Sequence, residues 1–455
     1  MGKLFGTDGV RGVANSELTP LMAYKIGRIT ANILLRDTKM PPKVIIGLDT
    51  RRSGAMLSAA LSAGICSAGG DVISLGVVPT PAVAFLVREL KCDAGIVISA
   101  SHNTMEYNGI KIFNSEGFKL RDELEEEIEA FTLSDKDDLP FVTGSNIGSI
   151  TEDYNAVDLY VDYMADIYGS IDLSNMKIAI DCAEGATYKA APAILRRLGA
   201  DLYTIHNKPN GININEKCGS TYMEAIKNFV TENSMDIGIA FDGDGDRCLM
   251  VDENGRELDG DQIMSICAHF MKEQGILAKN TLIITTMSNM GLAVMARDNN
   301  INIKRTDVGD KFVLEEMLKV GAVLGGEQSG HVIFLKHNTT GDGILTALSI
   351  LNIMKQKGES LSNINVRMKI MPQVLVGAEV SNNKKYDFDK VEEIKSAVSA
   401  LEKSYEDNGR VLIRASGTEP LVRIMIEGNN KVKMQEEANK LKDLIEKHLG
   451  SVDRR

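Results

Sequence analysis

The chain of 455 residues carries 63 acidic against 51 basic side chains, a formal net charge of −12, and is 44% hydrophobic. This composition is typical of a globular protein with room for three or four domains, and it excludes the basic footprint of a nucleic-acid binder. No apolar run of about 18 residues occurs, so we expect no membrane span, and the N-terminus lacks the apolar core of a secretion signal.

Three segments repeat one order of elements: strand, turn with small residues, helix, strand. They begin with KVIIGLDTRRSG at residue 43, KIAIDCAEGATY at residue 177 and TLIITTMSNMG at residue 281. This order predicts a mixed or parallel sheet. Each segment continues into a further apolar strand and a polar loop, in DAGIVISASHN, DIGIAFDGDGD and GAVLGGEQSGH. Ligands gather beyond the carboxyl ends of such strands, so we expect the three loops to share a cleft.

The pattern changes near residue 371. RVLIRASGTEPLVRIMIEGN predicts two strands around a polar Gly loop, and residues 431–450 show the spacing of an amphipathic helix. We therefore predict an α/β fold of three tandem related α/β domains with mixed sheets, plus a smaller C-terminal α+β domain, around a central cleft. The expected domains are 1–150, 151–255, 256–370 and 371–455.

The first loop, in GIVISASHNTMEYNGIKIF, contains a candidate nucleophile. Ser101 follows a predicted strand, but serine reacts only when a base or a metal assists it. His102 and Lys111 could supply proton transfer or positive charge. A simple capped turn is equally compatible with these residue types, and the chain has no GxSxG elbow of the acyl-transfer hydrolases.

The second loop sets Asp242, Asp244 and Asp246 two residues apart. Neighbouring carboxylates raise the cost of each other's ionisation, and a divalent cation removes that repulsion. Ligands that are all oxygen favour Mg²⁺ or Ca²⁺. A calcium hand needs Gly at its sixth position, where this chain has Arg247. Arg247 would instead place a cation beside any anion that the metal holds.

Five motifs occur in one order: SASHN, NGIK, DGDGDR, GEQSGH and RASGTEP. With them the chain resembles the α-D-phosphohexomutase superfamily over essentially its whole length. FGTDGVRG, CGST and Gln328 are most similar to the members that interconvert glucosamine 6-phosphate and glucosamine 1-phosphate. The resemblance implies a phosphoserine enzyme and a glucosamine 1,6-bisphosphate intermediate and activator, feeding UDP-N-acetylglucosamine and cell-wall precursor synthesis. The alternatives are a mutase for glucose or mannose phosphates, a phosphatase with Asp242 as nucleophile, and a non-enzymatic calcium-binding module.

The resemblance also implies roles for single residues. Ser101 would carry the phosphoryl group, and its phosphate would bind one Mg²⁺ together with Asp242, Asp244 and Asp246. Lys111, His102 and His331 are the candidate bases, of which we favour Lys111, and Arg247 adds positive charge. The expected sugar and phosphate ligands are Glu327, Ser329, His331, Arg414, Ser416, Gly417, Thr418 and Arg423, with Arg11 reaching the cleft.

Two residues depart from the superfamily pattern. Thr104 stands where the pattern has proline, which loosens the serine loop, and Glu184 stands where many members have Asn. The expected partner is a phosphorylated amino sugar, with no nucleic acid and no membrane, and relatives of this type are commonly homodimers. The six cysteines include no CxxC pair, so we expect free thiols in a reducing cytoplasm.

Overall fold

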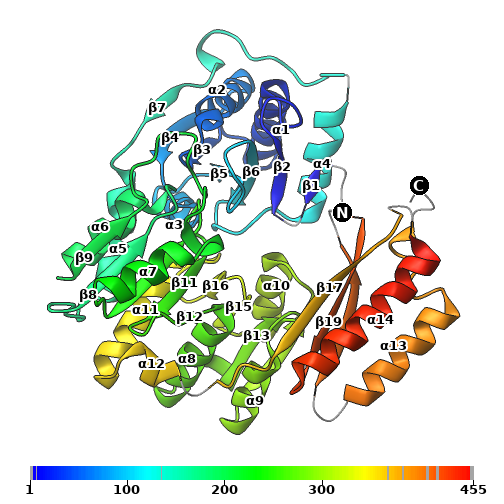
Figure 1. Ribbon diagram of the computed structural model, residues 1–455. Helices are drawn as coiled ribbons and strands as arrows, with labels where there is room; N and C mark the ends of the chain where they lie inside the picture. Colours follow the sequence, from blue (N-terminus) through cyan, green and yellow to red (C-terminus); the bar gives the residue numbers. More distant parts are fainter. Residues whose placement is uncertain are drawn as a thin grey trace. The chain divides into compact units, whose positions relative to one another are not determined.

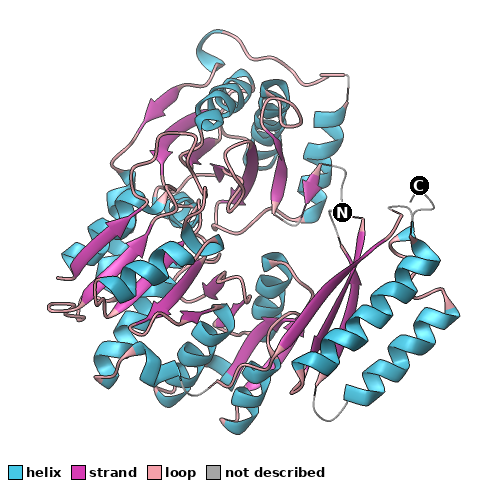
Figure 2. Cartoon of the chain, in the orientation of Figure 1, coloured by secondary structure: helices cyan, strands magenta, loops and turns pink. Residues whose placement is uncertain are grey.

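The computed structural model describes residues 4–6, 8–134, 136–365, 368–381, 384–405, 409–416 and 420–450. The chain divides into two compact units. The first comprises Met1–Ser288 and Ala296–Arg367, and the second comprises Asn289–Met295 and Met368–Arg455. Figures 1 and 2 show that helices flank the strands in both units. Among the described helices, none has the length and apolarity that crossing a bilayer requires.

The first sheet has the strand order β1-β2-β6-β5-β3-β4-β7. Its central strand β3 is parallel to β4 and β5, whereas β5 and β6 are antiparallel. Apolar side chains of β3 and β5 pack against Leu57 and Leu61, which are fully buried. The strands are β1 Phe5–Gly6, β2 Gly9–Val13, β3 Lys43–Leu48, β4 Asp71–Val77, β5 Ala94–Ile98, β6 Tyr107–Asn114 and β7 Ile150–Glu152, and the helices are α1 Pro20–Thr38, α2 Arg52–Ser67, α3 Thr80–Glu89, α4 Asp122–Leu133 and the 3₁₀ helix η1 Gly144–Asn146.

The second sheet has the order β12-β11-β10-β8-β9, and the third has the order β14-β13-β15-β16. The elements of the second are α5 Ala156–Ile167, β8 Lys177–Asp181, α6 Thr187–Arg197, β9 Asp201–Ile205, η2 Gly219–Thr221, α7 Glu224–Glu232, β10 Ile237–Phe241, β11 Cys248–Asp252 and β12 Glu257–Leu258. Those that follow are α8 Gly260–Glu273, η3 Ala278–Asn280, β13 Thr281–Thr285, α9 Met290–Asp298, β14 Asn302–Thr306, α10 Asp310–Val320, β15 Leu324–Gly326, β16 Val332–Phe334, α11 Gly343–Lys357 and α12 Leu361–Ile364.

One strand order occurs in all three sheets. β4-β3-β5-β6 in the first corresponds to β9-β8-β10-β11 and to β14-β13-β15-β16. In each set the first three strands are parallel and the fourth is antiparallel. This shared order confirms the strand–helix–strand repeat that the sequence predicts for three segments. Ser101, Asp242 and Glu327 therefore lie in corresponding loops, each just beyond the third strand of its set.

The second unit has an antiparallel sheet in the order β17-β19-β18. The predicted amphipathic helix is α14, whose buried side chains include Met434, Ala438, Leu441 and Ile445. α14 packs beside α13 and against the sheet (Figure 1). The fold class is thus as predicted, while the four domain borders remain predictions. The elements are β17 Gln373–Glu379, α13 Glu392–Tyr405, β18 Arg410–Ala415, β19 Leu421–Glu427 and α14 Lys431–Leu449.

Candidate active site

The Ser101 hydroxyl points at the acidic loop. Ser101 is buried and has φ 51°, a left-handed conformation that is uncommon outside glycine. Its backbone N–H donates to Ser99 Oγ at 2.9 Å, and its own Oγ donates to Asp242 Oδ2 at 2.8 Å. His102 Nδ1 lies 3.3 Å from the same Oγ. The first and second repeats therefore bring a candidate nucleophile and a candidate metal ligand into contact.

Two side chains fix the backbone of the serine loop. The buried Arg51 guanidinium donates to the carbonyl oxygens of Ser101 at 3.0 Å and Asn103 at 2.7 Å. It also donates to the Thr104 carbonyl. Asn215 Nδ2, from the second repeat, donates to the carbonyls of Ser101 and Asn103 at 2.8 Å each. These bonds restrain the loop at the point where Thr104 has no proline ring to do so.

The acidic loop is built to hold a cation. Asp242, Asp244 and Asp246 are buried, and one carboxylate oxygen from each lies within 4.8 Å of the other two. The Oδ1 atoms of Asp244 and Asp246 are buried without a hydrogen-bond partner among the described residues. A Cβ on Gly243 would lie 2.6 Å from the Ser101 carbonyl oxygen, so only glycine permits the close approach of the two loops.

The charges of the acidic loop also favour a bound cation. Burial, followed by the charges of Asp246 and Asp244, raises the pKa of Asp242 well above its usual value. Buried polar atoms normally have partners, and unpartnered carboxylate oxygens in a closely spaced set fit a hard divalent ion. The loop joins strands β10 and β11 rather than two helices, which excludes a calcium hand here.

Lys111 is a buried cation inside this acidic group. Its Nζ lies 2.9 Å from Asp244 Oδ2, 2.9 Å from Asp8 Oδ2 and 3.3 Å from Asp246 Oδ2. Burial disfavours the charge, but the carboxylates outweigh it and raise the pKa of Lys111 well above its usual value. A protonated amine cannot accept a proton. The base role of Lys111 stays an untested prediction, and its contacts support charge neutralisation instead.

Replacing Lys111 with methionine should destabilise the fold. The substitution keeps the length of the side chain but leaves buried carboxylates without their cation, which typically costs about 3–5 kcal/mol. Urea unfolding at pH 7 without divalent metal checks this, with Lys189→Met on the exposed side of α6 as the control. An unfolding free energy equal to that of wild type would show that Lys111 is not the counter-charge.

The same ion pair gives wild type a dependence on pH. Although burial opposes its ionisation, Lys111 and a hydrogen bond from Thr80 lower the pKa of Asp244 to about 2. An unfolded aspartate has a pKa of about 3.9. The ionised carboxylate therefore stabilises the fold above pH of about 4, and the contribution is lost as the pH falls toward 2. Lys111→Met should lose less stability over this interval than wild type.

Unlike Lys111, His102 can accept a proton at neutral pH. Burial, and then the charges of Arg247 and Arg11, lower the pKa of His102 to about 4. At neutral pH the imidazole is therefore uncharged and has a free electron pair. Arg11 lies at the same loop, donating to Asn103 Oδ1 at 3.3 Å and to Asp8 at 3.2 Å. The structure thus places Arg11 beside the serine loop.

The third repeat contributes the segment from Glu327 to His331. His331 forms a β-bridge with Arg247, which joins this segment to the acidic loop. Its Nε2 accepts a hydrogen bond from the Gly341 N–H at 3.2 Å, so its Nδ1 carries the proton in the neutral ring. Nδ1 and Ser329 Oγ are both buried without a partner among the described residues. Such polar atoms are suited to a ligand.

Glu327 and Gln328 are held by neighbouring backbone and side chains. Glu327 Oε1 accepts a hydrogen bond from the Gly309 N–H at 3.0 Å. Gln328 Nε2 donates to Asp259 Oδ2 at 3.1 Å, and Asp259 is the N-cap of α8. Sequence reasoning left open whether Gln328 faces solvent. Its bond to the helix cap fixes the loop in which Glu327 and Ser329 lie.

The second unit contains the remaining predicted residues. Arg414 on β18 and Arg423 on β19 are directly paired across the sheet, and Ser416 is buried just after β18. Burial, and then the charge of Arg423, lowers the pKa of Arg414. Two adjacent guanidinium groups suit an anion that relieves their repulsion. Gly417 and Thr418 lie outside the described residues.

The cysteines do not form disulfides. All six are free and buried. Burial, with the charge of Asp181 next, raises the pKa of Cys218 to about 12. Burial likewise raises the pKa of Cys267 to about 12. Without a bound metal, these two thiols are therefore protonated at neutral pH.

Models of known protein families match most of the chain. Four sequence models of phosphoglucomutase/phosphomannomutase match it in order: alpha/beta/alpha domain I at residues 2–138, domain II at 158–255, domain III at 259–370 and the C-terminal domain at 375–444. A phosphoglucosamine mutase of Ruminiclostridium cellulolyticum is 53% identical over 452 residues, which are 99% of this chain and 100% of the relative. That of Acetivibrio thermocellus is 52% identical over 450 residues, again 99% and 100% of the two chains.

Solved structures share the fold at low sequence identity. A phosphoglucomutase/phosphomannomutase family protein of Burkholderia thailandensis superposes with a TM-score of 0.80 at 23% identity, covering 97% of each chain. The N-acetylphosphoglucosamine mutase of Aspergillus fumigatus, in complex with GlcNAc-6P and magnesium, has a TM-score of 0.71 at 17% identity, covering 97% of this chain and 95% of its own.

Proposed function

The chain belongs to the phosphoglucomutase/phosphomannomutase family, and on that premise we propose that it interconverts glucosamine 6-phosphate and glucosamine 1-phosphate. Relatives that are 52–53% identical over nearly the whole chain are phosphoglucosamine mutases. The observation that carries the mechanism is the contact between Ser101 Oγ and Asp242 in the acidic loop, at 2.8 Å. Such a reaction would feed UDP-N-acetylglucosamine and cell-wall precursor synthesis.

Ser101 is the phosphoryl carrier in this proposal. A hydroxyl oxygen of the sugar attacks the phosphorus of phosphoserine 101, so that the new P–O bond forms as the bond to Ser101 Oγ breaks. The sugar hydroxyl loses its proton to a base, Ser101 Oγ gains a proton as it leaves, and glucosamine 1,6-bisphosphate results. The bisphosphate then reorients in the site and returns its other phosphoryl group to Ser101. Phosphoryl transfer of this kind needs alignment and charge neutralisation above all.

Asp242, Asp244 and Asp246, together with the phosphate of Ser101, would hold one Mg²⁺. The oxygens of Asp244 and Asp246 that make no hydrogen bond with the described residues support this assignment, and the complex of the Aspergillus fumigatus enzyme contains magnesium. When bound, the ion neutralises and polarises the phosphoryl group. Arg247 lies beside Asp246, with its Nε 3.9 Å from Oδ1, and adds positive charge.

Of the three candidate bases, we assign proton transfer to His102. It is neutral at neutral pH and lies beside Ser101 Oγ, so it can take the Ser101 hydroxyl proton when the bisphosphate returns a phosphoryl group and give a proton back when Ser101 Oγ leaves. Lys111 is held in its charged form by carboxylates, and His331 presents a protonated Nδ1. Lys111 therefore neutralises charge, and His331 donates a hydrogen bond to the sugar.

The remaining predicted residues would bind sugar hydroxyls and phosphate groups. Glu327, Ser329 and His331 would hold sugar hydroxyls, with Arg11 close to the serine loop. Arg414, Ser416, Gly417 and Thr418, assisted by Arg423, would hold the phosphate that does not react. A serine-to-alanine variant of the Aspergillus fumigatus enzyme has been solved in complex with glucose 1,6-bisphosphate, which supports a bisphosphate as intermediate and activator here.

Two further properties belong to the proposal. The six free thiols fit a reducing compartment, and we place the chain in the cytoplasm, where its phosphorylated amino sugar would be made and used. By resemblance to mutases of this type, the chain would form a homodimer.

A side-by-side comparison of substrates tests the proposed function. We expect the purified protein, with Mg²⁺ and bisphosphate activator, to give a higher kcat/KM for glucosamine 6-phosphate than for glucose 6-phosphate or mannose 6-phosphate. A higher value for either neutral sugar would assign the phosphoglucomutase/phosphomannomutase reaction instead. Release of inorganic phosphate without isomerisation, with label found on Asp242, would indicate a phosphatase.

A further inference from the structure

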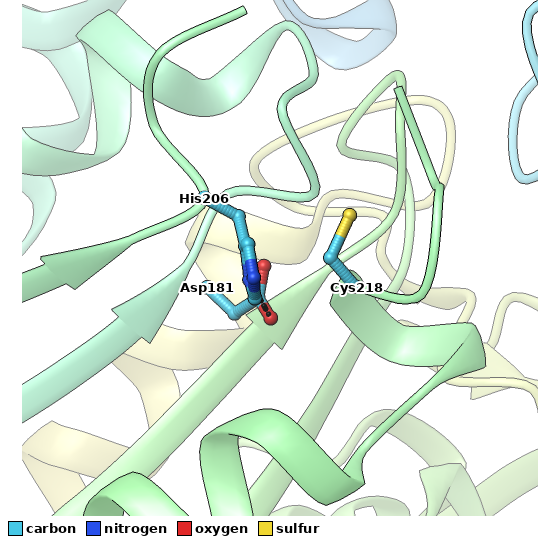
Figure 3. A group of neighbouring side chains, drawn as sticks. All are labelled: Asp181, His206 and Cys218. Atoms are coloured by element: carbon cyan, nitrogen blue, oxygen red, sulfur yellow. Dashed lines mark hydrogen bonds and ion pairs between the residues drawn. The ribbon is translucent and has the colours of Figure 1, made fainter. Parts of the chain in front are cut away.

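A second group of potential metal ligands lies at the ends of β8 and β9. Asp181 is the last residue of β8, His206 follows β9 directly, and Cys218 precedes η2 (Figure 3). One potential ligand atom from each of the three residues lies within 4.8 Å of the others. Within the described residues, this group and the Asp242 loop are the two clusters of this kind. The mechanism proposed above uses neither His206 nor Cys218.

The group is ordered by its own contacts. His206 Nδ1 lies 2.8 Å from Asp181 Oδ2 (Figure 3), and Asp181 Oδ1 accepts a hydrogen bond from the Ala183 N–H at 2.8 Å. Asp181 and Cys218 are fully buried, whereas 32% of the His206 side chain is exposed. An ion could therefore enter past the imidazole and reach two buried donors.

Glu184 adds an unused carboxylate oxygen beside the group. Its backbone N–H donates to the His206 carbonyl at 2.8 Å, and its charge acts on both His206 and Cys218, although its carboxylate is not among the ligand atoms that lie within 4.8 Å of one another. One carboxylate oxygen interacts with the backbone amide of Lys208. Glu184 Oε2 is buried and has no hydrogen-bond partner among the described residues. An unsatisfied buried carboxylate oxygen calls for a partner, such as a water molecule or an ion.

The donor set identifies the class of ion. The Asp242 loop offers only oxygen, which suits Mg²⁺, whereas this group offers sulfur, nitrogen and oxygen. Thiolate and imidazole select zinc-type transition metals over magnesium, and three such donors leave the fourth position of a tetrahedral site to water or a further carboxylate. We propose that Asp181, His206 and Cys218 bind one Zn²⁺, with the Glu184 carboxylate nearby, at a site separate from the magnesium loop. Binding replaces the thiol proton of Cys218, which is released to solvent.

The position of the site gives the ion a structural task. His206 and Cys218 bracket a loop whose Asn215 donates to the Ser101 and Asn103 carbonyls. Within that loop the Gly211 carbonyl accepts a hydrogen bond from the Arg52 N–H at 2.8 Å. An ion that joins His206 to Cys218 fixes both ends of the segment that supports the serine loop. This consequence for catalysis rests on the proposed function, whereas the zinc site itself does not.

Metal content provides the test. After incubation with Zn²⁺ in excess Mg²⁺ and removal of free metal, the full-length protein should retain about one zinc per chain by plasma mass spectrometry. Loaded with Co²⁺ as the probe, it should show a thiolate-to-cobalt charge-transfer band. Cys218→Ser and His206→Gln should lose both signals. Cys267→Ser, which removes a buried thiol of α8, and Asp246→Asn should keep them.

The outcomes separate this proposal from the mutase reaction. Zinc retained by a protein without mutase activity would refute the proposed function alone. Wild type that retains no zinc, or Cys218→Ser and His206→Gln that retain it with the cobalt band, would overturn the site. If circular dichroism shows that Cys218→Ser fails to fold, then His206→Gln, at a partly exposed position, decides between these results.

Discussion

Ser101→Ala should lower mutase turnover by about 10⁴-fold or more, since removal of a covalent nucleophile typically has an effect of this size. The substitution removes the only atom of this residue that can accept the phosphoryl group. Ser101 Oγ is the hydroxyl that contacts Asp242, so no compensating group stands in its position. The Michaelis constant should change little, because the sugar and phosphate ligands are untouched.

Intact-mass spectrometry gives the matching structural readout. Incubated with glucosamine 1,6-bisphosphate and Mg²⁺, wild type should gain the mass of one phosphoryl group, and Ser101→Ala should gain none. Ser115→Ala, which removes an exposed hydroxyl in the turn after β6, serves as the control and should behave as wild type. Turnover by Ser101→Ala at a rate near that of the control would refute the phosphoserine mechanism.

Asp246→Asn should lower kcat by about 10²–10³-fold even at saturating Mg²⁺, because loss of an anionic ligand weakens both binding and polarisation by the ion. The amide keeps the size of the side chain, so the fold should persist. Asp246 suits this test because its Oδ1 is buried without a hydrogen-bond partner among the described residues. Asp201→Asn, at an exposed position on β9, is the matched control.

Titration with Mg²⁺ after treatment with a chelator separates the two effects of Asp246→Asn. Wild type and Asp201→Asn should lose activity with the metal and regain it at low Mg²⁺ concentrations. Asp246→Asn should need more metal and should plateau at a lower rate. A variant that matches the control at every Mg²⁺ concentration would show that the acidic loop is not the metal site.

The repeated architecture was predictable because local patterns encode it. KVIIGL, KIAID and TLIIT are apolar runs of strand length followed by small residues and helical spacing, and they form β3, β8 and β13. The stripe of Met434, Ala438, Leu441 and Ile445 likewise predicted the buried face of α14. The spacing of apolar residues and the positions of turn residues depend on neighbours within a few positions, so a single sequence shows both.

Contacts between distant segments were not predictable in this way. The sequence analysis assigns no catalytic role to Arg51, and nothing in GLDTRRSG indicates that its guanidinium binds the carbonyls of the serine loop. Asn215 and Asp8 were missed for the same reason, since their partners lie far along the chain. The adjacent Asp49, whose Oδ2 lies 2.8 Å from Arg51 Nε, was the one local sign of a buried arginine.

The choice of base shows how tertiary charge changes a local interpretation. In sequence, no pattern ranks the candidate bases Lys111, His102 and His331, and Lys111 was favoured among them. The fold surrounds Lys111 with three carboxylates from two segments and buries His102 near two arginines. Protonation state follows from these surroundings, which no spacing rule reveals.

The central claim is that phosphoserine 101 and the three carboxylates share one divalent ion. A crystal of the phosphorylated protein soaked in Mn²⁺, with anomalous scattering recorded, tests it most directly. The expected map has a phosphoryl group on Ser101 and a single anomalous peak between that group and Asp242, Asp244 and Asp246. A phosphorylated Ser101 with no peak at the acidic loop, or a phosphoryl group on Asp242 instead, would contradict the account.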